Sequence, residues 1–241
     1  MSTNTSFKSF NFTQLLSYSL LLLATVFIFA IAESIRLMLE SYELNSLYVS
    51  FCTGFILFVP LVSIVLHPFV VKDAKEFDRS YLSTLLANIG LVIFVQFLFF
   101  LIWITDAIAV YSMYVDQSSF LAQAFNISSE SKGDFSQQFY VVNLLLAWFF
   151  ALLSIVIGLL PCLVARLNNQ GVIGNFVASF RLAKSCKLAM LGYALVLSLS
   201  VMLPLIYAKY VFLLTFPVSL YWLFMNISSR YRRLVRKNKK V

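Results

Sequence analysis

Residues 188–227 read LAMLGYALVLSLSVMLPLIYAKYVFLLTFPVSLYWLFMNI, a run of 40 residues with one charge, at Lys209. As a single helix this run would be about 60 Å long, about twice the hydrocarbon thickness of a bilayer. A single pass would also carry the basic residues that follow it to the opposite side of the membrane. The run therefore predicts two membrane-spanning helices, 188–208 and 211–227, joined by a tight turn at Lys209.

Four further apolar stretches precede this run, at 15–32, 47–71, 81–106 and 139–165. Of all residues 61% are hydrophobic and only 12% are charged, whereas soluble domains carry about 25% charged residues. The 241 residues provide six spans, one larger outer loop at 107–138 and a basic tail at 228–241, with no room for a separate soluble domain. We therefore predict an all-α polytopic bundle of about six transmembrane helices, forming a single domain over residues 1–241.

The basic residues fall on one side of the predicted membrane. Fifteen of the 18 lysines and arginines lie on the side of the two termini: Lys8, Lys72, Lys75, Arg79, Arg166, Arg181, Lys184, Lys187 and the seven from Arg230 to Lys240. The other side keeps Arg36, Lys132 and Lys209, together with seven of the ten acidic residues. Because lysine and arginine are retained in cytoplasmic segments, this distribution predicts a multi-pass protein of the cell inner membrane with both termini in the cytoplasm.

The first span ends in Ala30-Ile31-Ala32 before Glu33, which imitates a signal-peptidase site. A cleaved signal normally has a shorter apolar core behind a basic segment, whereas only Lys8 precedes this longer stretch. We predict an uncleaved anchor. The alternative, a cleaved signal peptide, leaves five spans and the same position of the C-terminus.

An amphipathic segment lies at residues 171–185, between the fourth and fifth spans. One helical face carries Val172, Ile173, Phe176, Val177 and Phe180, and the other carries Asn175, Ser179 and Lys184. This pattern predicts a helix that lies in the cytoplasmic membrane interface with its apolar face in the lipid.

Basic residues near this segment and in the tail are predicted to contact anionic lipid headgroups, each contributing about 1 kcal/mol. These candidate contacts are Arg181, Lys184, Lys187, Arg232, Arg233, Arg236 and Lys237. Because the basic residues lie at the ends of spans, we expect the lipid bilayer, and no nucleic acid, as their partner.

Ionisable groups near the membrane are candidates for function, because burying them in lipid is costly. Glu33 and Asp106 lie at the outer ends of the first and third spans, and Arg36 lies one helical turn from Glu33. These three residues form a candidate outward-facing polar cluster or transport site. The alternative is interfacial solvation together with an i, i+3 ion pair on one helix.

The sequence offers no pattern typical of a catalytic, cofactor or metal site. Cys52, Cys162 and Cys186 are odd in number and lack a CxxC spacing, and His67 is the single histidine. A phosphate-binding glycine loop, an HExxH motif and a GxSxG motif are all absent. We expect the chain to bind no metal ion and no cofactor.

One segment carries a family resemblance. Pro161 lies near a span end, Gly171 and Gly174 follow, and Ser179-Phe180-Arg181-Leu182 precedes the next span. This order resembles the YciC-like family of uncharacterised bacterial inner-membrane proteins, which share a six-span layout and an S-x-R-L segment before the fifth span. The resemblance implies a location and an architecture, and it carries no substrate or activity.

An enzyme would bring ionisable groups together, whereas the acids of this chain are scattered at the periphery. We therefore predict a non-enzymatic membrane protein that supports envelope organisation or a membrane complex, with other membrane proteins as partners. The alternative is a small secondary transporter or permease. It would use the outer carboxylates and the helices broken by Pro60 and Pro204, which occupy the middle spans of the two three-span halves.

Overall fold

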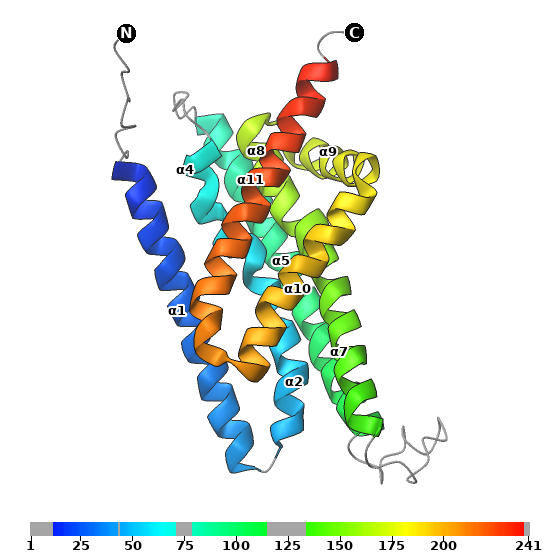
Figure 1. Ribbon diagram of the computed structural model, residues 1–241. Helices are drawn as coiled ribbons and strands as arrows, with labels where there is room; N and C mark the ends of the chain where they lie inside the picture. Colours follow the sequence, from blue (N-terminus) through cyan, green and yellow to red (C-terminus); the bar gives the residue numbers. More distant parts are fainter. Residues whose placement is uncertain (1–11, 43, 71–78, 115–133, 239–241) are drawn as a thin grey trace, which may run out of the picture.

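The structure is a computed structural model that describes residues 12–42, 44–70, 79–114 and 134–238. The side chains at 79–82, 113–114, 134–137 and 236–238 lie outside this description. Within the described ranges every regular element is a helix and no strand is present (Figure 1). The predicted all-α architecture is thereby confirmed.

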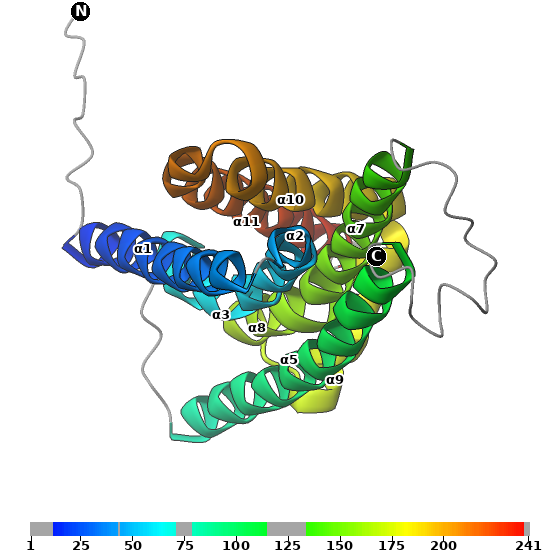
Figure 2. The same ribbon diagram turned by 90° about the horizontal axis from the view of Figure 1, so that it is seen from below.

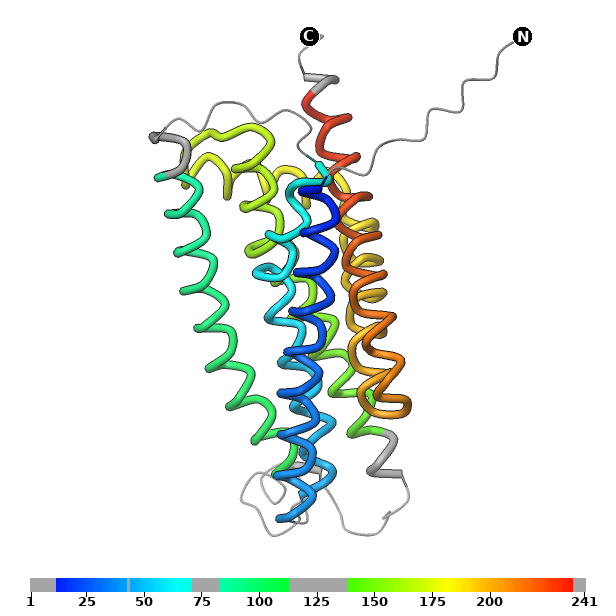
Figure 3. Tube along the Cα trace, turned by 90° about the vertical axis from the view of Figure 1, so that its left-hand side faces the viewer, coloured from blue at the N-terminus to red at the C-terminus, as the bar shows by residue number. Residues whose placement is uncertain are grey.

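Six helical segments in the described part of the chain are long and apolar enough to cross a membrane. They are Phe12–Ser41, Asn45–Val70, Ser83–Ser112, Gln138–Leu167, Lys187–Tyr207 and Lys209–Val235. They correspond one to one with the six predicted spans, and they run side by side along one long axis (Figures 1 and 3). The fold is therefore that expected of a multi-pass membrane protein.

Helix α1 (Phe12–Ser41) packs on the bundle with a single stripe of side chains. Its buried residues recur every three, four or seven positions: Ser17, Leu21, Thr25, Ile28, Ala32 and Leu39. The stripe continues past the predicted span end at residue 32, because Leu39 is buried on the same face. The other faces of α1 expose large apolar side chains such as Phe27, as a lipid-facing helix does.

The second span is the most enclosed, with most of its residues buried, and other helices surround it in the view along the bundle (Figure 2). It alternates between α-helical and 3-10 segments: α2 (Asn45–Gly54), η1 (Phe55–Phe58), α3 (Val59–Ser63), η2 (Ile64–Leu66) and α4 (His67–Val70). Pro60 explains the first change of geometry. A proline has no N–H, so the carbonyl of Ile56 loses its α-helical partner.

The third span is α5 (Arg79–Tyr114), and the fourth consists of α7 (Asp134–Leu153), a π-helical turn η3 (Ser154–Leu159) and α8 (Leu160–Leu167). The outer loop predicted at 107–138 is shorter than expected, because both helices extend into it; residues 115–133 lie outside the described part. Ala107 and Val110 continue α5 because they are buried on the stripe that includes Trp103.

The last three helices are α9 (Gly171–Ser185), α10 (Lys187–Tyr207) and α11 (Phe212–Asn238), with a 3-10 turn η4 (Lys209–Val211) between α10 and α11. Helix α9 lies across one end of the bundle (Figure 1). The predicted turn at Lys209 is confirmed. The basic tail predicted at 228–241 is continuous with the last span, since α11 runs through Asn238 and buries Ser228 and Tyr231.

The helices give the bundle two chemically different ends (Figures 1 and 3). We call the end formed by the start of α1, by α4, by the α8–α9 turn and by the end of α11 the basic end. Its described cations include Arg166, Arg181, Lys184, Lys187, Arg230, Arg232 and Arg233. The opposite end, formed by the α1–α2 turn, the end of α5 and the start of α7, is called the acidic end. It holds Glu33, Glu40 and Asp106 with only Arg36 and Lys209 as described cations.

Candidate functional site

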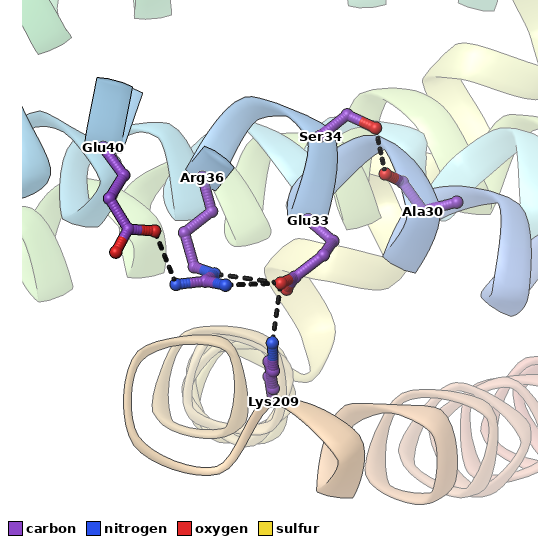
Figure 4. A network of polar contacts seen from close by, with 6 residues as sticks. All are labelled: Ala30, Glu33, Ser34, Arg36, Glu40 and Lys209. Atoms are coloured by element: carbon purple, nitrogen blue, oxygen red, sulfur yellow. Dashed lines mark hydrogen bonds and ion pairs between the residues drawn. The ribbon is translucent and has the colours of Figure 1, made fainter. Parts of the chain in front are cut away.

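The first candidate site is a charged network on the last turns of α1, at the acidic end (Figure 4). Glu33 Oε1 accepts hydrogen bonds from Arg36 Nη2 at 2.6 Å and from Arg36 Nε at 3.1 Å. Arg36 Nη1 also donates to Glu40 Oε2 at 3.2 Å. These residues face one another because positions three and four apart lie on one side of an α-helix. The structure thus joins two of the three predicted cluster residues, Glu33 and Arg36.

Lys209 enters this network from the α10–α11 turn, 176 positions along the chain from Glu33. Its Nζ donates to Glu33 Oε1 at 2.6 Å (Figure 4). The side chains of Glu33 and Lys209 are 22% and 31% exposed, so the ion pair is partly shielded from water. The sequence pattern predicted the turn but missed this contact. The one available signal was that Lys209 is the sole charge of its run and lies on the same side as Glu33.

Asp106, the third residue of the predicted cluster, lies apart from the other two. Within the described part of the chain no hydrogen bond or ion pair joins Asp106 to Glu33, Arg36 or Lys209. It is half-buried on α5, and α2 packs against both α1 and α5. The outer carboxylates therefore do not form one site.

A second candidate site is polar and lies inside the bundle, where α3, α5 and the π-helical turn meet. Ser154 Oγ donates to Gln96 Oε1 at 3.2 Å, and both residues are buried. Gln96 Nε2 has no hydrogen-bond partner among the described residues. Gly158 packs so closely that an added Cβ would lie 2.3 Å from Pro60 Cγ and 2.8 Å from Gln96 Nε2. The amide is therefore held between two irregular helical segments.

Prolines account for both irregular segments. Pro60 removes a hydrogen-bond donor from the second span, and Pro161 removes one from the fourth, immediately after the π-helical turn. The carbonyl of Ile157 thereby loses its α-helical partner, and the chain widens into the turn that precedes α8. Irregular backbone inside a membrane bundle is tolerated where protein encloses it. The irregular segments at Pro60 and Pro161 are both enclosed by the bundle.

Pro204 behaves differently from Pro60, whereas the transporter alternative expects both to break helices in matching positions. Helix α10 continues through Pro204 without a change of geometry. The carbonyl that Pro204 leaves without an α-helical donor belongs to Ser200, and it accepts a hydrogen bond from Thr215 Oγ1 of α11 at 3.1 Å. A neighbouring helix thus supplies the missing donor. The two three-span halves do not share a broken middle helix.

At the basic end, the turn between α8 and α9 is built by asparagines. Asn175 Oδ1 accepts from the backbone N–H of Gln170 at 3.0 Å, and Asn175 Nδ2 donates to Asn169 Oδ1 at 3.2 Å. Asn169 Oδ1 also accepts from the N–H of Gly171 at 3.1 Å. Gly171 has a φ of 78°, a conformation that favours glycine. These contacts fix the point where the chain leaves α8 and turns across the bundle.

The segment predicted as a helix at 171–185 is a helix, and its polar face is the one that packs on the bundle. Asn175 and Ser179 are fully buried against the bundle, because the first builds the turn and the second bonds the carbonyl of Asn175 at 2.7 Å. The apolar Ile173, Val177 and Phe180 are exposed. The outer face of α9 is therefore apolar, with basic residues near its end.

The predicted lipid contacts divide by location. Arg181, Lys184, Lys187 and Arg233 are exposed at the basic end. Arg232 donates to the backbone carbonyl of Val70 and so holds α11 against α4. Arg236 and Lys237 belong to the last turns of α11, where the described part of the chain does not include side chains.

Two hollows flank α9. One, of about 490 Å³, lies between α9 and α11 and is lined by Asn168, Arg181 and Tyr231 among others. The other, of about 370 Å³, lies between α7, the π-helical turn, α9 and α10, and has Lys184 and Lys187 in its lining. The first is mixed in polarity, whereas the second is apolar apart from its two lysines.

The described residues contain no group of three or more His, Cys, Asp and Glu side chains able to hold a metal ion. His67 is buried and its ring stacks on Phe224, with 5.7 Å between ring centroids. Cys52 and Cys162 are buried free thiols, and Cys186 is partly buried.

No family model, no curated protein and no solved structure matches the chain. The resemblance of residues 161–187 to the YciC-like family therefore stays a prediction.

Proposed function

We propose that the chain is a non-enzymatic, multi-pass protein of the cell inner membrane that supports envelope organisation or a membrane complex. One observation carries this proposal. Glu33, the outer carboxylate best placed for coupled transport, is engaged by Arg36 and Lys209 and ties α1 to the α10–α11 hairpin. A carboxylate paired in this way has a structural role, and no hydrogen bond or ion pair among the described residues joins Asp106 to it.

The orientation belongs to the same proposal. The basic end would face the cytoplasm and the acidic end the other side, because lysine and arginine are retained in cytoplasmic segments. The YciC-like resemblance supports the same placement. Cysteine accessibility at Ser46 and Arg233, both exposed and each substituted by cysteine in a chain free of its native cysteines, tests it. Labelling of Arg233→Cys from outside intact cells would overturn the orientation.

Helix α5 offers the surface that a complex requires. It is the least buried of the six spans, and its first half diverges from the other spans (Figures 2 and 3). One exposed stripe consists of Leu86, Gly90, Ile93, Phe97 and Leu101, at helical spacings of three and four. A small residue within an apolar stripe lets a second membrane-spanning helix approach closely. This surface supports an assembly with another membrane protein.

Co-purification tests the proposal with a matched pair of variants. An added Cβ at Gly90 or at Gly192 meets nothing within 4 Å, so either glycine can be replaced without disturbing the bundle. We expect the tagged chain to retain a reproducible set of membrane proteins. Gly90→Leu on α5 should lose them, and Gly192→Leu on α10 should keep them. Absence of any reproducible partner from the unmodified chain would contradict the proposal.

A small transporter or permease is the second candidate, and the buried polar centre favours it. Gln96 Nε2 lacks a described partner, and it lies between the segments interrupted by Pro60 and Pro161. Discontinuous helices around a polar group near the middle of a membrane are typical of transporter binding sites. The unbroken α10 argues against the matched broken helices that this class usually contains.

Flux measurements on purified protein in liposomes separate the two candidates. A transporter should lose proton or cation flux with Glu33→Gln, Asp106→Asn or Gln96→Leu, whereas Glu40→Gln serves as the control at the rim of the charged network. The proposed scaffold should show no flux above empty liposomes in any of them. Flux that depends on Glu33, Asp106 or Gln96 would replace the scaffold proposal with the second candidate.

A further inference from the structure

The apolar hollow beside α9 has an unusual lining. Val156 comes from the π-helical turn, Phe180 and Ala183 come from α9, and Leu191 comes from α10. Its charged lining residues, Lys184 and Lys187, lie where α9 ends and α10 begins. The volume of about 370 Å³ accommodates a stretch of acyl chain, although it is too small for a folded partner.

The two lysines have no ion-pair partner in the part of the chain that the structure describes. Every salt bridge among the described residues lies in the Glu33 network at the acidic end. The acidic side chains that the structure describes, those of Glu33, Glu40 and Asp106, all lie toward that end. Two neighbouring exposed cations next to an apolar hollow therefore call for a partner that is both anionic and apolar.

The exposed face of helix α9 indicates where the hollow would lie relative to lipid headgroups and acyl chains. Its exposed Ile173, Val177 and Phe180 form an apolar outer face, which positions such a helix at the boundary between headgroups and acyl chains. Phe180 belongs both to this face and to the lining of the hollow, and the lysines lie at the junction of α9 and α10. A membrane that covers this face would therefore bring lipid tails next to the apolar walls. Trp148 Nε1 donates to the carbonyl of Leu191 at 3.0 Å, which fixes one wall to α7.

We propose that this hollow binds an anionic phospholipid, with one acyl chain between α7, α9 and α10 and its phosphate on Lys184 and Lys187. The inference rests on the membrane location proposed above and is independent of the scaffold or transport role. The hollow between α9 and α11 is mixed in polarity, and it is not part of the proposed lipid site.

Photocrosslinking of the purified full-length chain tests the site directly. A phosphatidylglycerol with a diazirine in one acyl chain should label residues around Val156, Phe180 and Leu191. A phosphatidylcholine with the same acyl chain should label them far less, with each lysine contributing a preference of about fivefold. Inorganic phosphate in excess should not reduce the labelling, because it supplies no acyl chain.

Substitutions separate this site from general attraction to an anionic surface. Lys184→Gln together with Lys187→Gln should bring phosphatidylglycerol labelling down to the phosphatidylcholine level. The control, Arg181→Gln together with Arg233→Gln, removes the same charge from exposed positions outside the hollow and should reduce the labelling far less than the lysine pair does. Ala183→Leu, which fills the hollow without a change of charge, should reduce labelling by both lipids; circular dichroism checks that it remains folded.

Three results would overturn the inference. They are equal labelling by the two lipids, labelling spread along α1 and α5, and equal effects of the lysine pair and the arginine pair. Displacement by inorganic phosphate would assign the lysines to a soluble anion instead. Each of these outcomes leaves the co-purification and flux results intact, so failure of the lipid site is distinguishable from failure of the proposed function.

Discussion

Charged side chains at the acidic end of the bundle form ion pairs with one another, whereas the described lysines at the basic end do not. At the acidic end, Arg36 and Lys209 both form ion pairs with Glu33, so these charges are neutralised within the molecule. At the basic end, Lys184 and Lys187 are exposed and have no acidic partner among the described residues. Among the described residues, compensation is therefore internal at the acidic end, whereas Lys184 and Lys187 remain open to an anionic partner at the basic end.

This difference separates two uses of an ionic group in a membrane protein. The internal network orients helices, because Lys209 can reach Glu33 only if the α10–α11 turn lies against α1. The exposed cations orient the whole molecule relative to a charged leaflet. Substitutions at the acidic end should consequently change the stability of the bundle, whereas substitutions at the basic end should change its response to anionic lipid.

The largest effect on stability should come from the interior of the bundle, where Gly158 of the π-helical turn packs against Pro60 of the second span. Gly158→Ala places a Cβ 2.3 Å from Pro60 Cγ, a proline ring that cannot rotate away. We expect the free energy of unfolding to fall by about 2–3 kcal/mol, measured by denaturant titration in detergent micelles. Gly192→Ala is the control: its Cβ meets nothing within 4 Å, and it should stabilise α10 by about 0.5–1 kcal/mol. Equal responses of the two variants would show that the centre is loosely packed.

A charge reversal tests the internal compensation at the acidic end. Lys209→Glu replaces an attraction to Glu33 by a repulsion, and it should lower the free energy of unfolding by about 1–2 kcal/mol. Lys209→Met removes the attraction only and should cost less. Both are measured by the same titration in a neutral detergent. A Lys209→Glu variant as stable as the unmodified chain would mean that the ion pair does not hold the hairpin.

The basic end should give the reverse result. In neutral detergent, Lys184→Gln together with Lys187→Gln should change the free energy of unfolding by less than about 0.5 kcal/mol, because exposed residues without partners are replaced. Added phosphatidylglycerol should raise the midpoint temperature of the unmodified chain and not that of the variant. If the double variant is destabilised in neutral detergent as well, the lysines have a structural partner and the contrast between the ends disappears.

The smallest effect is the salt dependence of the internal pair. A double-mutant cycle of Glu33→Gln and Lys209→Met should give a coupling energy of about 0.2–1 kcal/mol for this partly exposed pair. The coupling should decrease between about 0.05 M and 1 M salt, because the Debye length falls to about 3 Å at 1 M. A coupling energy that does not respond to salt would indicate a pair more deeply buried than its exposed fractions imply.

Much of the fold follows from local patterns in the sequence. Lys209 marked a turn because a run of 40 residues with a single charge is too long for one pass, and the apolar residues of 171–185 recur at the helical period. The limits of the longest loop could not be read in the same way. Ala107 and Val110 pack as part of α5, and nothing in their local composition distinguishes the end of a lipid-facing helix from the start of a loop.

The candidate sites depend on contacts between distant residues, which no local pattern encodes. Glu33 and Lys209 meet only after the last hairpin docks on α1. Pro60 and Pro204 looked equivalent in sequence, yet Thr215 supplies a donor to the carbonyl of Ser200 and α10 remains regular. Asn175 lies on the polar face of the predicted helix, and it is buried because it builds the α8–α9 turn.

The divergence of α5 makes the molecule wider at the basic end, which also carries α9, than at the acidic end (Figures 2 and 3). In a bilayer, such a wedge occupies more area in one leaflet than in the other. The leaflet on the wide side is expanded locally, and the membrane relaxes by bending until it is convex on that side. A bundle of this shape would therefore be at lowest energy in curved membrane, and shape alone would bias where in the envelope it accumulates.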